Sequence, residues 1–224
     1  MWLMYRRMSP RRHPKEADGL SQVAPFNIIV AGVGGQGNLV CSRALGEAAM
    51  ESGVSPTIGQ TFGASRRGGS VLTHVRLADR MVAPLIPRGH LNLLLGLEPL
   101  EGLRAVVQFG SRETVAVMID RPIDTVDTLT GEREYPDIDE LFRRTVRLCH
   151  QTYRVEPPLE KLPSVRSLNA YVLGIVAGLE IAPIKMEALE DAVSRIDSGL
   201  GHNIKAFDMG VSHARGLQPL GLFS

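Results

Sequence analysis

The stretch FNIIVAGVGGQG, Phe26–Gly37, decides the fold. Residues 26–31 form a β-branched run of the kind that makes a strand buried on both faces, and the run ends at Gly32. Beyond Gly37, apolar residues recur every three or four positions, which predicts an amphipathic helix with its apolar face at Leu39, Val40, Ala44, Leu45, Ala48 and Ala49. Strand, glycine turn and helix together are the opening of an α/β unit.

The remaining chain continues this alternation. Apolar runs predict strands at 54–58, 92–97, 113–120 and 153–156, and helices are expected after Pro99 and at 137–150, 168–179 and 184–196. We therefore expect an α/β fold: a Rossmann-like, mostly parallel sheet with helices on both faces. Residues 70–77 differ because they alternate, with His74 and Arg76 on the polar side, and this indicates a half-exposed antiparallel element at an edge.

Composition limits the function classes. The chain has 224 residues, 44% of them hydrophobic, and a net charge of +1, so it can bury a core but has no basic field for nucleic acid. Cys41 and Cys149 are isolated, so their thiolates cannot build a zinc or iron–sulfur ligand set. No apolar run is long enough for a membrane span and the start lacks a secretory signal pattern, so we expect a cytoplasmic protein that binds no membrane.

Three regions follow from these patterns. Residues 1–24 mix Arg, Pro, Gly and Ser without a period and are expected to be a disordered basic tail. Residues 25–198 are expected to form a single α/β domain. Residues 199–224 are interpreted as a glycine-rich C-terminal tail with no assigned structure.

The glycine motif is the first candidate site. Gly32, Gly34 and Gly37 satisfy G-x-G-x-x-G between a predicted strand and helix, where backbone N–H groups and the helix dipole can hold a phosphate. A dinucleotide site also requires an acidic residue about 20 positions on, and 54–60 contains none. Simple strand-to-helix packing is therefore the favoured explanation of these glycines.

Two further segments are candidates. Ser65-Arg66-Arg67-Gly68-Gly69 is either a loop that contacts an anion or a partner, or a solvated turn. Glu98 follows a predicted buried strand, where it is either functional or a carboxylate at a helix start. His74 is expected to pack rather than catalyse, and the sequence contains no nucleophile or metalloprotease motif.

Four segments in order resemble a known family. Residues 28–37, 65–71, 84–87 and 95–101 are similar to the gamma-type domain of the 2-oxoacid:ferredoxin oxidoreductases, and most similar to the version in indolepyruvate-type enzymes. The similarity covers about 26–196, including Asn169. One departure is Phe62, which stands where the family commonly has the His of His-Gly-Met-Ser-Gln-Arg-Gly-Gly.

The resemblance implies a subunit that is not catalytic alone. In such complexes a 2-oxoacid and coenzyme A are converted to acyl-CoA and carbon dioxide, with electrons passing to ferredoxin. The resemblance places thiamine diphosphate and iron–sulfur clusters on a larger partner subunit and no cofactor on this chain, which would meet ferredoxin only indirectly. Coenzyme A is a possible ligand, and the expected binding residues are Gly32, Gly34, Gly35, Gln36, Gly37, Ser65, Arg66, Arg67, Gly68, Gly69 and Glu98.

Two alternatives belong to other classes. One is a stand-alone nucleotide-binding or regulatory module that uses the loop Gly32–Gly37 as a phosphate cradle. The other is a purely architectural subunit without any ligand.

Overall fold

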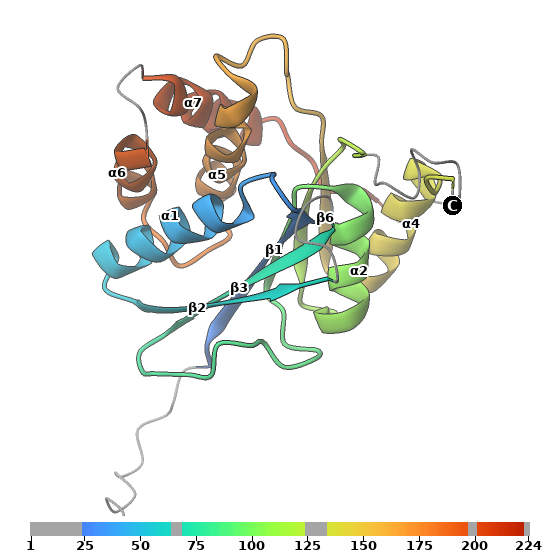
Figure 1. Ribbon diagram of the computed structural model, residues 1–224, viewed down its shortest axis with the longest axis horizontal. Coiled ribbons are helices and arrows are strands. Elements are labelled where there is room, and N and C mark those ends of the chain that lie inside the picture. The colour runs from blue at the N-terminus through green and yellow to red at the C-terminus, as the bar shows by residue number, and fades with distance from the viewer. Residues whose placement is uncertain (1–23, 64–68, 124–133, 197–200, 222–224) are drawn as a thin grey trace, which may run out of the picture.

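A single six-stranded mixed sheet forms the centre of the computed structural model, which describes residues 24–63, 69–123, 134–196 and 201–221 (Figure 1). The strand order is β2-β3-β1-β4-β5-β6. The strands are β1 (Phe26–Val33), β2 (Ser55–Phe62), β3 (Ser70–Ala78), β4 (Leu93–Gly96), β5 (Val115–Ile119) and β6 (Gln151–Val155). Strands β1, β4, β5 and β6 are parallel, while β3 is antiparallel to both of its neighbours. The predicted α/β fold with a mostly parallel sheet is confirmed.

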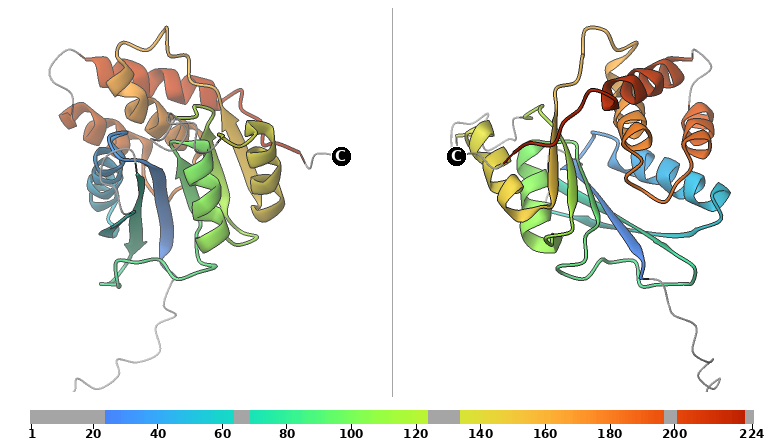
Figure 2. Two further views of the ribbon diagram at one scale, coloured as in Figure 1. Left: turned by 45° about the vertical axis from the view of Figure 1, so that its right-hand side comes forward. Right: turned by 180° about the vertical axis from the view of Figure 1, so that it is seen from behind.

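Helices cover both faces of this sheet (Figure 2). One face packs against α1 (Asn38–Glu51), α5 (Leu168–Leu179), α6 (Met186–Ile196) and α7 (His202–Ala214), and the other against α2 (Pro99–Phe109) and α4 (Ile138–Leu148). The side chains of β1 alternate between two apolar clusters: Ile28 and Val30 join the first, Ile29 and Ala31 the second. This two-sided burial explains why the run is continuously apolar.

The structure corrects the expected position of the antiparallel strand. Strand β3 lies between β2 and β1, and the edge strand is β2. His74 is only 1% exposed, and its ring packs edge to face on Phe109 at 5.1 Å between centroids. Arg76 donates from Nε to Asn27 Oδ1 at 2.9 Å and from Nη1 to Ala83 O at 2.8 Å. The polar face of β3 is buried because the loop that follows the strand returns over it and supplies hydrogen-bond acceptors.

The C-terminal region also differs from the expected tail. Residues 202–214 form α7, which packs along α5, and Phe207 is buried. A Cβ atom added at Gly174 would collide with Phe207 O, and one added at Gly210 would collide with Tyr171 O. Gly210, one of the glycines that suggested a tail, thus meets Gly174 of α5 and lets the two helix backbones touch. Residues 1–23, which hold nearly all of the predicted N-terminal tail, lie outside the described part of the chain.

The apolar face predicted for α1 is wrong at its start. Leu39 and Val40 are 46% and 42% exposed, whereas Ala44, Leu45, Ala48 and Ala49 are buried. Among the described residues, no helix is both long and apolar enough to cross a bilayer.

Candidate functional site

The glycine loop lies where the two layers of helices diverge. Strand β1 continues through Gly34–Gly37 into α1 on one face, whereas its parallel neighbour β4 continues through Leu97 into α2 on the opposite face. Open α/β sheets bind ligands at such a point, outside the carboxyl ends of the strands. The structure has a cavity of about 380 Å³ there, which we call the crevice. It is lined by Val33, Gly34, Gly35, Gln36, Leu97, Arg121, Ile123, Val165, Arg166, Leu168 and Asn169.

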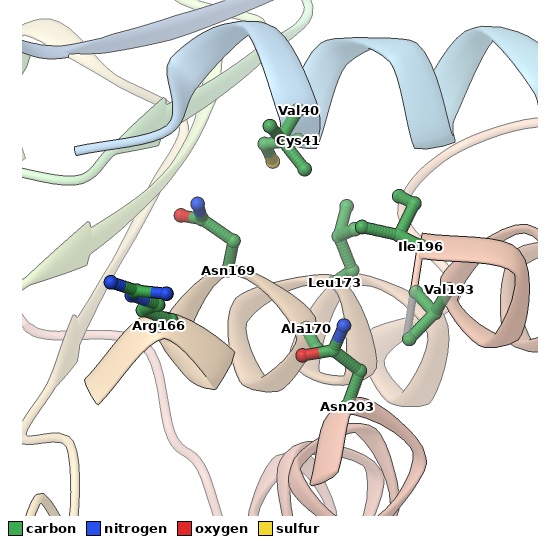
Figure 3. A pocket seen from close by; sticks show the side chains of 9 residues that line it. All are labelled: Val40, Cys41, Arg166, Asn169, Ala170, Leu173, Val193, Ile196 and Asn203. Carbon is green, nitrogen blue, oxygen red and sulfur yellow. The ribbon is translucent and has the colours of Figure 1, made fainter. Parts of the chain in front are cut away.

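A second cavity of about 520 Å³, the α1 pocket, surrounds the first turn of α1. Its lining shares Gly35, Gln36, Arg166 and Asn169 with the crevice. The remaining lining residues are Gly37, Val40, Ser164, Ser167, Ile196, His202 and Asn203. Figure 3 shows Arg166 and Asn169 at the start of α5, with the Asn169 amide reaching toward α1.

The lining of the two cavities is cationic. Arg121 and Arg166 line the crevice, Arg166 also lines the α1 pocket, and among the described residues neither lining includes an Asp or Glu. Helix α1 begins at its N-cap Gly37 without a side-chain cap and without an acidic residue in its first turn. The positive end of the helix dipole and the guanidinium groups therefore favour an anionic ligand.

The backbone of the glycine loop is largely bonded within the protein. Val33 N donates to Gln36 Oε1 at 2.7 Å, Gly34 N to Gly69 O at 2.9 Å, and Gln36 N to Val33 O at 3.2 Å. These three N–H groups cannot also cradle a phosphate. The contribution of this loop to anion binding therefore comes from the start of α1, not from the loop's own amides.

Two side-chain amides occupy the space that two glycines leave open. At Gly32 an added Cβ would lie 2.5 Å from Gln36 Oε1, and at Gly37 it would collide with Asn169 Nδ2. Gly37 also has φ +85°, a conformation that favours glycine. Asn169 Nδ2 donates to Gln36 O at 2.9 Å and lies 3.4 Å from Gly37 O. The first and last glycines of the motif thus make room for Gln36 and Asn169.

The topology does not suit a dinucleotide. Such a fold needs the neighbour of β1 to end at the glycine loop with an acidic residue for the ribose hydroxyls. On the side of β1 away from β4, where that strand would lie, the neighbour is the antiparallel β3, which begins there with Ser70 opposite Val33. Strand β2 ends at Phe62, one strand further away, and carries no acid. This arrangement argues against dinucleotide binding, which is one form of the stand-alone nucleotide-binding or regulatory module.

Glu98 is the N-cap of α2. Its Oε2 accepts from Glu101 N at 2.8 Å, and its Oε1 accepts from the Tyr135 hydroxyl. Burial raises the pKa of Glu98, which is 2% exposed, and hydrogen bonds from Tyr135 and the backbones of Glu101 and Ile123 partly oppose this. Glu98 lines neither the crevice nor the α1 pocket. Its link to the crevice is the hydrogen bond that it accepts from the backbone of Ile123, which is a lining residue.

The second predicted loop joins the first. Ser65, Arg66, Arg67 and Gly68 lie outside the described residues, while Gly69 is described and accepts the hydrogen bond from Gly34 N. Of this predicted loop, Gly69 is therefore the residue seen to contact the glycine loop.

Several lining residues were missed from the sequence. Arg121, Arg166, His202 and Asn203 belong to no motif, and Asn169 entered only through the family resemblance. Arg121 had a usable signal, because it comes two residues after β5, at the same carboxyl edge as the glycine loop. Arg166 had none, because its place depends on the short 3₁₀ helix η1 (Val165–Ser167) that leads into α5.

The thiols are not reactive groups. Cys41 and Cys149 are free and buried, and burial raises the pKa of each to about 12. In the described ranges, no group of three or more His, Cys, Asp or Glu side chains is arranged to hold a metal ion.

Fold and site together define an α/β protein with an arginine-lined crevice at the point where its helices change face. The chain belongs to the pyruvate ferredoxin/flavodoxin oxidoreductase family, whose model matches residues 27–213. It is 34% identical to the indolepyruvate oxidoreductase subunit IorB of Archaeoglobus fulgidus, over 84% of this chain and 95% of that protein. It is 30% identical to IorB of Pyrococcus horikoshii, over 85% and 96% respectively.

Solved structures agree on the fold. The gamma subunit of a keto/oxoacid ferredoxin oxidoreductase from Geobacter sulfurreducens superposes with a TM-score of 0.60 at 22% identity, covering 85% of this chain and 99% of that one. A 2-oxoglutarate:ferredoxin oxidoreductase from Magnetococcus marinus gives 0.63 at 19% identity, covering 88% of this chain and 32% of that larger one.

Proposed function

We propose that this chain is the subunit without cofactors of a 2-oxoacid:ferredoxin oxidoreductase of the indolepyruvate type. The complex would decarboxylate an aryl 2-oxoacid oxidatively with coenzyme A, yield acyl-CoA and carbon dioxide, and pass electrons to ferredoxin. Thiamine diphosphate and iron–sulfur clusters would reside on a larger partner subunit. The observation that carries this proposal is the match to IorB proteins over nearly their whole length.

The chemistry of the cavity walls supports a subunit that binds a ligand while its partner subunit carries the reactive cofactors. Among the described residues, the lining offers arginines, amides, hydroxyls and one imidazole but no carboxylate, and Cys41, which lines a separate small cavity beside α1, is buried with a raised pKa. Such groups bind and orient an anion rather than break a carbon–carbon bond. The free thiols support a cytoplasmic location.

Within this function, the crevice and the α1 pocket are proposed to hold the phosphate groups of coenzyme A. Arg121, which follows β5, and Arg166, which precedes α5, both line the crevice, and Arg166 also lines the α1 pocket. Guanidinium groups bind phosphate oxygens in pairs, and the uncapped start of α1 adds a favourable dipole. Gly35, with φ +104° and nothing within 4 Å of an added Cβ, leaves the loop surface open to such a ligand.

Reconstitution tests the proposal. The chain is coexpressed with the thiamine-dependent subunit encoded beside it, and indolepyruvate-dependent and coenzyme A-dependent reduction of ferredoxin is measured. We expect activity only from the complex, and Arg166→Ala should raise the KM for coenzyme A about tenfold. Arg195→Ala is the matched control, because Arg195 pairs with Glu47 and Glu51 on the surface of α1 and α6. Turnover by the isolated chain, or failure to associate with that subunit, would contradict the proposal.

A further inference from the structure

We propose that Gln36 and Asn169 are positioning residues: their amides link the end of β4 to the start of α5 and hold the first turn of α1 in place opposite Arg166. This arrangement would set the affinity of the α1 pocket for a phosphate group. The inference deepens the proposed function and rests on it for the identity of the ligand.

Gln36 forms the first half of the link. Its Oε1 accepts from Val33 N at 2.7 Å, and its Nε2 donates to Leu97 O at 2.9 Å. The side chain therefore ties the carboxyl end of β1 to that of β4, where the two chains leave for opposite faces of the sheet. The Gln36 side chain thus fixes the separation of Val33 and Leu97, which both line the crevice.

Asn169 forms the second half. Its Nδ2 donates to Gln36 O at 2.9 Å and lies 3.4 Å from Gly37 O, a contact that spans more than 130 residues of sequence. Arg166 lies in η1, three residues before Asn169 in the first turn of α5, and Arg166 N donates to Ser164 Oγ at 3.2 Å. The contact therefore determines where Arg166 stands relative to α1.

The two carbonyls that Asn169 contacts belong to the peptide units that start α1. In a trans peptide the C=O and N–H vectors point in opposite directions. Fixing the carbonyls of Gln36 and Gly37 therefore fixes the N–H groups of Gly37 and Asn38, which are among the donors that a helix start offers to an anion. Gly37 O in addition accepts from Cys41 N at 3.0 Å, so the constraint extends into the first helical turn.

Neutral substitutions of similar shape separate positioning from folding. Asn169→Leu and Gln36→Met remove the amides without adding charge. The matched control is Asn92→Leu, because Asn92 Oδ1 accepts from Asn27 N at 2.8 Å at the opposite, amino edge of the sheet. All three variants lose a side-chain amide hydrogen bond, but only the first two lose one that touches the crevice or the α1 pocket.

The assembled complex provides the first readout. We expect Asn169→Leu and Gln36→Met to raise the KM for coenzyme A about tenfold while kcat changes less than twofold. Asn92→Leu should lower the melting temperature and leave that KM unchanged. A wild-type KM in Asn169→Leu, or an equal increase in Asn92→Leu, would overturn the inference.

Hydrogen exchange on the full isolated chain provides a second readout that needs no ligand. In Asn169→Leu, the amide of Cys41, which donates to Gly37 O, should exchange faster than in the wild type, while in Asn92→Leu it should not. Unchanged exchange at Cys41 in Asn169→Leu would refute the positioning role. If exchange changes as expected but coenzyme A does not saturate even the wild-type complex, the ligand assignment fails and the positioning role stands.

Discussion

Replacing Gly37 by Ala tests how the glycine loop is held. At φ +85° an alanine is strained by about 1–2 kcal/mol. Its Cβ would also collide with Asn169 Nδ2 and displace the amide from Gln36 O, and losing a partly buried hydrogen bond costs about 1–2 kcal/mol. The sum of about 2–4 kcal/mol corresponds to a fall in melting temperature of roughly 5–15 °C for a chain of this size.

The matched variant is Gly35→Ala. Gly35 has φ +104° but no atom within 4 Å of an added Cβ, so its substitution introduces backbone strain without a collision. Unfolding in urea is measured for both variants, each made in the wild-type and in the Asn169→Ala background. Removing the Asn169 side chain should reduce the cost of Gly37→Ala by about 1–2 kcal/mol and leave the cost of Gly35→Ala unchanged. Equal costs of Gly37→Ala in the two backgrounds would refute the reasoning.

Three further predictions concern the rest of the fold. Gly210→Ala should destabilise the protein by about 1–3 kcal/mol in urea unfolding, because the added Cβ would collide with a backbone carbonyl of α5. Gly46→Ala is the control and should change stability little, because the atom nearest to its Cβ is the movable end of the Ile58 side chain. Glu98→Gln should gain stability relative to the wild type as pH rises above about 4.5. The pKa of Glu98 is raised in the folded protein, so ionisation of this carboxyl at higher pH favours the unfolded state of the wild type and not of the variant. Urea unfolding at pH 4 to 8 checks this, and a pH-independent difference in stability would contradict it. Cys41 and Cys149, with pKa values near 12, should resist iodoacetamide in the native protein at pH 8 and react after unfolding, as followed by mass spectrometry.

The reasons for the corrections are physical. The alternation in 70–77 correctly indicated an antiparallel strand, but the burial of His74 and Arg76 depends on the loop after the strand, where Ala83 O accepts from Arg76 and Ile86 N donates to His74. Gly210 of α7 resembles a glycine of a tail until its contact with α5 is known. In both cases the local pattern was read without the contacting segment, and that segment determines whether the residues are buried or exposed.

Short-range periodicity was sufficient to determine the strand, turn and helix of residues 26–51, the helix at Leu168–Leu179, and the alternation that makes the sheet mostly parallel. These features depend on the spacing of apolar residues over short stretches of sequence, which can be read without knowing the rest of the fold. The crevice required the folded molecule, because Gln36, Arg121, Arg166 and Asn169 come from three separate regions of the chain. Their convergence is set by strand order and by which face each helix takes, and both are decided by the packing of the whole core.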